Sequence, residues 1–316
     1  SRARSPFDLT SPTRTHFPQT DINLMFAGTH TAIVTPFRNG RLDEEALKKI
    51  IDYQFDGGVQ GVVPCGTTGE SPTLDYEEHE RVIQLTVGFA RGRGIVMAGT
   101  GSNSTREAIE MTQEAEAVGA TASLHVAPYY NKPTQEGLFR HFRDIAKNTS
   151  LPIMLYSIPG RCGVEIAVET VVRLAEACPN IRAIKEAGGN ADRVSTMKQL
   201  LPEEFEILSG DDSLTLPFMS VGGKGIVSVA GNLIPKEMST MVQHALKGEW
   251  AEAQAIHAKF NPLFGMFLKL STNPIPIKTA LALKGLCDGE LRLPMCEMTE
   301  SQTAELRDTM VKLGIL

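Results

Sequence analysis

From residue 29 onward, short apolar runs alternate with longer stretches in which apolar side chains recur at helical spacing. The short runs are continuously apolar, which is typical of parallel strands buried on both faces. They cover residues 32–34, 61–64, 95–98, 122–127, 153–156, 181–187, 205–208 and 225–229. Helices are predicted to begin near residues 43, 75, 104, 134, 167, 190, 213 and 235, where capping residues or proline precede the periodic stretches.

Eight strand–helix units in one run predict an α/β fold, a closed (β/α)8 TIM barrel over residues 25–248. An open, doubly wound sheet is the alternative, and eight near-equal units favour closure. Three further periodic stretches, residues 250–270, 277–286 and 301–313, predict a C-terminal helical domain over residues 249–316.

Residues 1–24 differ from the rest of the chain. They are rich in Ser, Thr, Pro and Arg and show no apolar periodicity, so they cannot bury enough surface to offset the entropy of ordering. We expect a disordered leader, a remnant of expression or an upstream extension of the reading frame, with Met25 as the natural start.

Composition narrows the class of protein. The net charge of −6, without a long basic run, argues against nucleic acid or a membrane surface as partner. No apolar run is long enough to cross a bilayer. The five cysteines are scattered without a C-x-x-C pair, which predicts reduced thiols and a cytoplasmic location.

Lys185 is the first candidate for chemistry, because it interrupts the apolar strand at residues 181–187. Burial disfavours the charged ammonium group and lowers its pKa, which makes the amine a nucleophile suited to Schiff-base formation. In the alternative, Lys185 sits at the end of the strand, where it reaches water or pairs with a carboxylate.

Other candidates follow the carboxyl ends of the strands, where barrels of this type carry their sites. Residues 66–70 (GTTGE) offer two hydroxyls and backbone N–H groups to a carboxylate, unless they form only an ordinary turn. Residues 128–131 bring two tyrosines. Tyr156 could relay protons, and Arg161 could clamp a carboxylate, although it could equally be a surface arginine.

Metal chemistry is disfavoured, and no cofactor is expected. The seven histidines show no ligand spacing, which argues against a zinc-dependent aldolase. Asp211 and Asp212 could bind a metal or cap the next helix. Residues 225–229 could close the floor of the pocket with backbone carbonyl groups.

Over residues 25–316 the chain resembles the dihydrodipicolinate synthase family, also called 4-hydroxy-tetrahydrodipicolinate synthases. The matching stretches are residues 66–70, 128–131, 156–163, 184–187, 210–212 and 273–276. The resemblance implies a Schiff-base lyase on a (β/α)8 barrel, commonly a homotetramer built as a dimer of dimers.

The resemblance also implies a reaction. Lys185 would condense with pyruvate, and the resulting enamine would add to the aldehyde of aspartate-semialdehyde. Transimination by the amine of the substrate would release a cyclic product that feeds diaminopimelate and lysine synthesis.

The resemblance implies roles for further residues. Thr68, Tyr130 and Tyr156 match the proton-relay triad of the family, with Tyr130 donated across a subunit interface. Thr67 and Thr68 match contacts to the pyruvate carboxylate. Separately, Arg161 matches the arginine that holds the carboxylate of the semialdehyde, and Ile226 matches a backbone-carbonyl contact near the lysine.

Within the wider superfamily, sialic-acid lyases carry Ser-Thr in place of Thr67-Thr68 and lack an arginine at the position of Arg161. Both features favour the synthase, although Ser157, Gly160 and Cys162 stand where the synthase usually has Asn, Ser and Thr. The alternatives are another pyruvate-dependent aldolase, such as an N-acetylneuraminate lyase or a keto-sugar-acid aldolase, and a barrel without catalytic activity.

Many members of the family are inhibited by lysine between subunits. The positions that match this site here are Ser71, Pro72, Leu74, Tyr76, His79, Asn103, Glu107 and Tyr129. Tyr76 and Pro72 depart from a common bacterial pattern, so feedback inhibition is a hypothesis.

Overall fold

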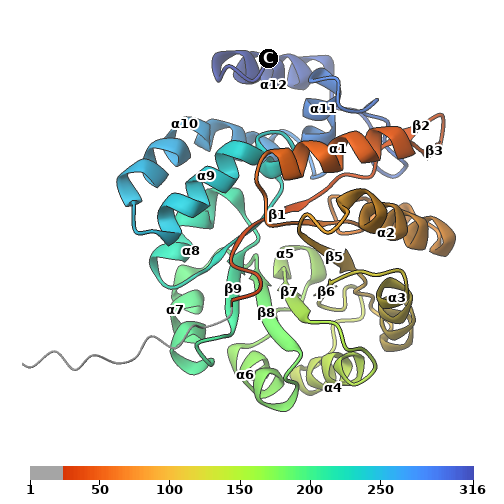
Figure 1. Ribbon diagram of the computed structural model, residues 1–316, viewed down its shortest axis with the longest axis vertical. Coiled ribbons are helices and arrows are strands. Elements are labelled where there is room, and N and C mark those ends of the chain that lie inside the picture. Colours follow the sequence, from red (N-terminus) through yellow and green to blue (C-terminus); the bar gives the residue numbers. More distant parts are fainter. Residues whose placement is uncertain (1–23) are drawn as a thin grey trace, which may run out of the picture.

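The computed structural model describes residues 24–316. Within them, eight parallel strands close into a barrel in the order β1–β10–β9–β8–β7–β6–β5–β4 (Figure 1). Closure is direct, since β1 pairs with both β10 and β4. The barrel strands are β1 Gly28–Ala32, β4 Gly61–Val63, β5 Ile95–Gly99, β6 Ala122–Val126, β7 Ile153–Ser157, β8 Ile181–Glu186, β9 Glu206–Ser209 and β10 Gly225–Ser228. The predicted (β/α)8 barrel is therefore confirmed over the open sheet.

Helices follow the strands and surround the barrel (Figure 1). They are α1 Glu44–Asp56, α2 Tyr76–Ala90, α3 Thr105–Ala117, α4 Gln135–Ala146, α6 Val168–Ala177, α7 Ala191–Leu200, α8 Thr215–Ser220 and α9 Pro235–Leu246. Their starts follow from local chemistry, because several are preceded by a polar side chain that accepts a backbone N–H of the first turn. These capping residues are Asp43, Asp75, Ser104, Thr134 and Asn190.

The first strand lies earlier than its predicted position at residues 32–34. It begins at Gly28 and includes Thr29, His30 and Thr31, which are polar but completely buried. Two of them find partners: the Thr29 hydroxyl donates to the Met238 carbonyl, and His30 Nε2 bonds the Phe26 carbonyl. Because Thr29, His30 and Thr31 are polar, this strand lacks the apolar signal on which the prediction depended.

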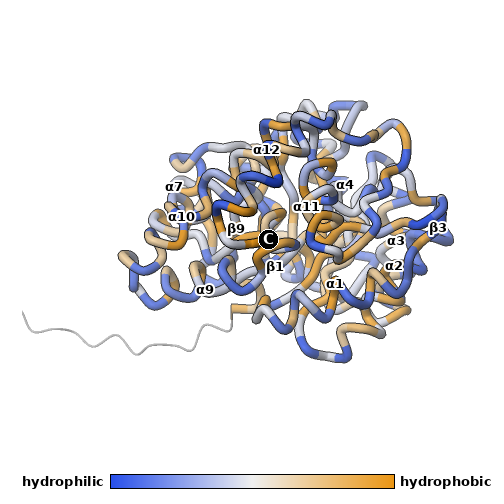
Figure 2. Tube along the Cα trace, turned by 90° about the horizontal axis from the view of Figure 1, so that it is seen from above, coloured by the Kyte–Doolittle hydropathy of each residue, from blue (hydrophilic) through white to orange (hydrophobic). Residues whose placement is uncertain are grey.

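Several short elements were not predicted. They are the hairpin β2 Phe37–Arg38 with β3 Arg41–Leu42, the helix α5 Pro159–Cys162, and the 3-10 turns η1 Ser71–Thr73, η2 Asp212–Leu214 and η3 Ala230–Asn232. Each is shorter than the windows in which periodicity can be detected. Four of them, α5, η1, η2 and η3, lie in the segments that follow barrel strands, so they shape the loops at the carboxyl end of the barrel. In Figure 2, β3 is a hydrophilic segment at the edge of the molecule.

Apolar side chains fill both sides of the strands. One cluster occupies the barrel interior, and its members include Val63, Met97, Leu124, Met154, Ala183 and Leu208. Larger clusters lie between the strands and the surrounding helices. The alternation of side chains along each strand produces this division.

The predicted C-terminal helices are α10 Trp250–Lys269, α11 Ile275–Leu283 and α12 Glu300–Lys312, and α11 lies beside α12 (Figure 1). Their buried side chains, such as Ile277 and Leu306, belong to the same apolar cluster as Ile50 of α1 and Met238 of α9. The C-terminal helices are thus packed directly on the barrel helices. The expectation for residues 1–24 falls, apart from residue 24, outside the described residues. Across residues 24–316, no helix has the length and apolar character needed to span a bilayer.

Candidate active site

Lys185 lies in β8 with its side chain inside the barrel, and it is only 5% exposed. Burial lowers its pKa to about 8; the negative charge of Asp212 opposes this shift and the positive charge of Arg161 adds to it. The amine lies 4.1 Å from the centre of the Tyr156 ring, on the neighbouring strand β7. The expectation that Lys185 is buried is therefore confirmed, and the alternative in which it reaches bulk water is wrong.

Glu186 follows Lys185 but points to the opposite face of β8. Its carboxylate is completely buried and accepts hydrogen bonds from Arg193 Nε at 2.9 Å and from the Gly188 N–H at 2.8 Å. Burial raises the pKa of Glu186, while the charge of Arg193 opposes the shift. These two hydrogen-bond donors hold the Glu186 carboxylate between the strands and the surrounding helices, away from the amine of Lys185.

Tyr156 is buried, and burial raises the pKa of its phenol; the Arg161 charge and a hydrogen bond with the Thr67 side chain act in the opposite direction. The Thr68 hydroxyl instead accepts a hydrogen bond from Asn273 Nδ2 at 3.1 Å. The structure thus pairs Tyr156 with Thr67, whereas the resemblance placed Thr68 in the proton relay with Tyr156 and Tyr130. Thr67 and Thr68 are adjacent residues of the same type on a tight loop. The sequence therefore could not indicate which of the two side chains faces Tyr156.

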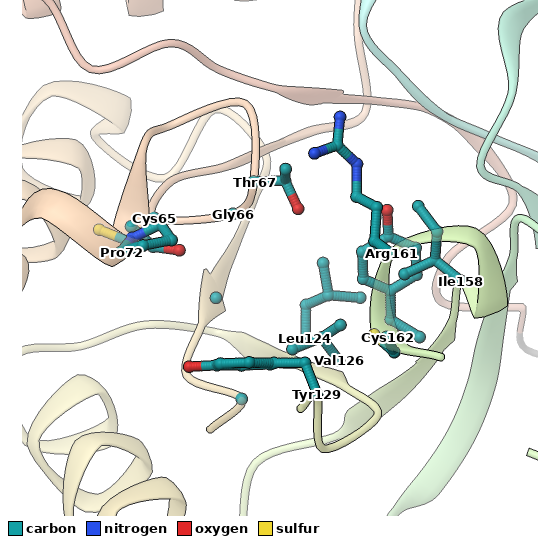
Figure 3. A pocket seen from close by; sticks show the side chains of 14 residues that line it. Cys65, Gly66, Thr67, Pro72, Leu124, Val126, Tyr129, Ile158, Arg161 and Cys162 are labelled. Carbon is teal, nitrogen blue, oxygen red and sulfur yellow. The ribbon is translucent and has the colours of Figure 1, made fainter. Parts of the chain in front are cut away.

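Two adjoining cavities open at the carboxyl ends of the strands. The inner one, of about 80 Å³, is lined by Lys185, and the outer one, of about 220 Å³, shares Thr67, Tyr156 and Arg161 with it. Figure 3 shows Thr67 and Arg161 close together at the outer cavity, with Tyr129 and Cys162 on other parts of its wall. The predicted residues that line the inner cavity are Thr67, Thr68, Tyr156, Arg161 and Lys185.

Arg161 belongs to the short helix α5, which follows β7. Its Nη2 donates to the Asn273 carbonyl at 3.1 Å, although the residue is exposed to solvent at the mouth of the cavity. A guanidinium group carries five N–H donors in a planar fork, so one contact to a carbonyl leaves others for a carboxylate. The position at the cavity favours a binding role over that of an ordinary surface arginine.

Tyr130 is 91% exposed and lines neither cavity of the single chain. Its backbone has φ +73°, in the left-handed region that non-glycine residues rarely adopt. Ile226, in β10, packs its side chain into the apolar cluster outside the barrel. The structure of one chain therefore does not bring these two side chains to Lys185.

Asp212 was expected only as half of an aspartate pair. Its buried carboxylate accepts the Ser228 hydroxyl and the N–H groups of Val229 and Ala230. Burial raises its pKa to about 6, with Ser228 opposing the shift. Asp211 is a cap, accepting the Ser213 N–H at 2.8 Å. Within residues 24–316, no group of three or more His, Cys, Asp or Glu residues is arranged to hold a metal ion.

Asn273 is a site residue that strand-by-strand reasoning missed. It precedes α11 in the C-terminal region, lines the inner cavity, and contacts Thr68 and Arg161. No strand end signals it. The only sequence signal was its place in the stretch 273–276 that carries the family resemblance.

A third cavity, of about 430 Å³, lies next to the outer one, and both are lined by Ser71, Pro72 and Tyr129. It is lined by most positions of the expected lysine site: Ser71, Pro72, Leu74, Tyr76, His79, Glu107 and Tyr129. Asn103 is not among the lining residues; its Nδ2 donates to the Tyr129 carbonyl at 3.1 Å. Glu107 Oε2 accepts the Ser102 hydroxyl at 2.9 Å.

Comparison with known proteins identifies similar chains. Residues 25–313 match the family model described as the dihydrodipicolinate synthetase family. A 4-hydroxy-tetrahydrodipicolinate synthase of Sulfurihydrogenibium sp. (strain YO3AOP1) is 51% identical over 293 residues, which cover 92% of this chain and 100% of the relative.

Two solved structures are similar over nearly their whole length. The 4-hydroxy-tetrahydrodipicolinate synthase of Methylacidiphilum fumariolicum SolV has a TM-score of 0.90 at 53% identity, covering 91% of this chain and 96% of that one. The dihydrodipicolinate synthase of Cyanidioschyzon merolae with lysine bound has a TM-score of 0.90 at 41% identity, covering 93% of this chain and 100% of that one.

Proposed function

The chain belongs to the dihydrodipicolinate synthetase family and is a lyase with the activity of a 4-hydroxy-tetrahydrodipicolinate synthase, and from this premise we propose that Lys185 binds pyruvate as a Schiff base. The observation that carries the proposal is a single amine inside the barrel, 5% exposed, with its pKa lowered to about 8. At pH 7 about a tenth of such amines are neutral, several hundred times the fraction for an ordinary lysine.

The chemistry begins with attack of the neutral Lys185 amine on the keto carbon of pyruvate. Water leaves as the imine forms, and its departure needs a proton, which Tyr156 supplies as general acid. Loss of a proton from the methyl carbon gives the enamine. The enamine carbon bonds to the aldehyde carbon of aspartate-semialdehyde, whose oxygen takes up a proton. The substrate's own amine then attacks the imine carbon and expels Lys185, which closes the ring.

Thr67 extends this proton path. Its side chain hydrogen-bonds Tyr156, so protons can pass between the phenol and the loop at residues 66–70. Thr68, next to it, is 3% exposed and lines the same cavity as the amine. We assign Thr67 to the relay together with Tyr156, and both threonines to the pyruvate carboxylate.

Arg161 binds the carboxylate of aspartate-semialdehyde. It lies at the outer side of the cavity, where the second substrate must approach an enamine already attached to Lys185. Its positive charge also disfavours protonation of Lys185, so it serves both substrates. Ile226 is assigned only its backbone carbonyl, because its side chain packs outside the barrel.

Tyr130 completes the relay from a second copy of the chain. A tyrosine that is 91% exposed, on a loop beside the active site and with a left-handed backbone, has a conformation more easily explained by an intermolecular contact than by packing within the chain. We therefore propose a tight dimer, doubled to a homotetramer. The barrel at residues 25–248 would carry the site, and residues 249–316 would form the helical domain.

The third cavity is the proposed site for inhibition by lysine. It offers Glu107 for an amino group, and it shares Tyr129 with the outer active-site cavity, so a ligand there could affect substrate binding. The Cyanidioschyzon merolae enzyme has been solved with lysine bound, which supports by analogy that this chain binds lysine. Turnover measured with and without millimolar lysine tests it, and an unchanged rate would remove the site from consideration.

We also propose a cytoplasmic location. All five cysteines lie in the described part of the chain and are free thiols, as expected for a reducing compartment.

Borohydride trapping tests the central assignment. Incubation with pyruvate and borohydride should add one reduced pyruvate to Lys185, identified by peptide mass spectrometry, and Lys185→Arg should prevent it. An unmodified Lys185 would contradict the mechanism. Assays of pyruvate with aspartate-semialdehyde against sugar-acid aldehydes separate the synthase from the other pyruvate-dependent aldolases.

A further inference from the structure

A buried ion pair joins helix α11 to the loop that follows β4. Lys278 Nζ lies 2.6 Å from Glu70 Oε1, and the two side chains are 0% and 2% exposed. The mechanism above uses neither residue. A buried ion pair is weak grounds for stability, because well-packed apolar side chains often serve as well in its place. The pair therefore calls for another explanation.

The surroundings of Glu70 hold its carboxylate in one orientation. The second oxygen, Oε2, accepts the backbone N–H of Arg292 at 3.1 Å. The Lys278 amine and the Arg292 guanidinium lie 4.2 and 4.1 Å from the centre of the same ring, that of Phe37. Burial lowers the pKa of Lys278, and the charge of Glu70 opposes that shift. Both oxygens of one carboxylate are thus bound by donors from the C-terminal region.

The backbone of Glu70 closes the loop that carries the two threonines. Its N–H donates to the Thr67 carbonyl at 3.1 Å, and the Gly69 N–H donates to the Gly66 carbonyl at 3.1 Å. Glu70 has φ +54°, a left-handed conformation that a non-glycine residue keeps only where its surroundings impose it. The ion pair is a constraint of that kind, applied to the residue on which the turn depends.

The same C-terminal segment also contacts the site directly. Asn273, two residues before α11, donates to the Thr68 hydroxyl and accepts from Arg161 through its carbonyl, both at 3.1 Å. A displacement of the start of α11 would therefore move the threonine loop, because Asn273 contacts Thr68 and Lys278 contacts Glu70 at the end of that loop.

We infer that Lys278 is a positioning residue for pyruvate binding, which acts through Glu70 to hold Thr67 and Thr68 where they meet the substrate carboxylate. The inference rests on the proposed function, because it takes these two threonines as the pyruvate contacts. It makes the C-terminal helical region, 208 residues away along the chain from Glu70, part of the substrate site.

Lys278→Met is the first variant to test, in the full-length protein. Methionine keeps much of the shape of the lysine stem but leaves the buried carboxylate of Glu70 without its cation. We expect the KM for pyruvate to rise by about tenfold or more, with borohydride trapping at low pyruvate slowed in proportion. The KM for aspartate-semialdehyde should change by less than about threefold, since Arg161 is bound by the Asn273 backbone rather than by Lys278.

Two further variants keep the test decisive. Lys49→Met removes another lysine that joins the barrel to the C-terminal region, through the Gly285 carbonyl at 2.7 Å, but away from the threonine loop. It should keep the wild-type KM for pyruvate. Glu70→Gln preserves size and an acceptor for the Arg292 N–H, so it should raise the KM less than Lys278→Met does. If Lys278→Met fails to fold, Glu70→Gln becomes the test of the inference. A wild-type KM for pyruvate in Glu70→Gln would then overturn it.

A purely structural role predicts a different pattern. A folded Lys278→Met with a lowered Tm and an unchanged KM for pyruvate would show that the pair contributes only stability, which refutes the inference. Failure of the proposed function is recognised separately: the wild-type protein itself would form no adduct with pyruvate. An adduct in the wild type, with equal pyruvate affinity in Lys278→Met, refutes only the positioning role.

Discussion

Replacing Lys185 by methionine should abolish the pyruvate adduct and at the same time stabilise the fold. The amine is buried, and its pKa is lowered from 10.5 to about 8. A pKa that is lower in the folded than in the unfolded state means that the unfolded chain binds more protons between these two values. Below about pH 8 the folded protein therefore bears the full cost of a buried ammonium group.

The size of this cost follows from the shift. The difference between a pKa of 10.5 in the unfolded chain and about 8 in the folded protein corresponds to about 3 kcal/mol of lost stability. This is an upper value, since water penetration and relaxation of the surroundings reduce the cost. Methionine fills a similar volume without a charge to bury. At pH 7 we expect Lys185→Met to raise the free energy of unfolding by about 2–3 kcal/mol relative to wild type.

The pH dependence identifies the cause. As pH rises from 8 toward 10.5 the folded wild-type protein loses the Lys185 proton while the unfolded chain still holds it. Wild-type stability therefore rises, and the advantage of Lys185→Met should shrink toward zero. Urea unfolding of both proteins at about pH 7 and about pH 9.5, at one protein concentration, measures this difference. Lys247→Met, at an exposed position after α9, is the control and should show no such trend. An advantage that is absent, or equal at both pH values, would refute the reasoning that burial lowers the pKa of this amine.

Four other substitutions test the site. Tyr156→Phe should lower kcat by about a hundredfold or more, the usual contribution of a general acid–base, and steady-state turnover checks it; wild-type turnover would exclude the phenol as proton donor. Thr67→Val should mainly lower kcat, because Thr67 contacts Tyr156, whereas Thr68→Val should mainly raise the KM for pyruvate; kinetics showing the reverse pattern would return the relay role to Thr68. Arg161→Met should raise the KM for aspartate-semialdehyde by about ten- to a hundredfold, the value of a charge-assisted hydrogen bond to a carboxylate, while pyruvate trapping persists; loss of trapping instead would place Arg161 on the first substrate.

Local patterns predicted the barrel because each strand and helix carries its own signal. The caps at Asp43 and Asp75 and the apolar run around Lys185 needed no knowledge of distant residues. The same local criterion misplaced β1, because Thr29, His30 and Thr31 are polar although the fold buries them completely. Short elements such as α5 were missed for the related reason that they lack a full period.

Some features of the candidate site could likewise be predicted from local sequence, and others could not. Lys185, Tyr156 and the threonine loop were predictable, since a parallel barrel brings the carboxyl ends of all its strands to one face. The choice of Thr67 over Thr68 as the partner of Tyr156 depended on how the loop turns, which adjacent residues of the same type cannot reveal.

By itself, then, the sequence determined the order of strands and helices, the buried lysine and the chemistry that this lysine can perform, because these depend on periodicity and on residue type. The folded structure alone brings Asn273 and Lys278 into contact with a loop more than 200 residues earlier in the chain. The physical reason is that hydrogen bonds and ion pairs act over a few ångströms in space, and separation along the chain does not report that distance.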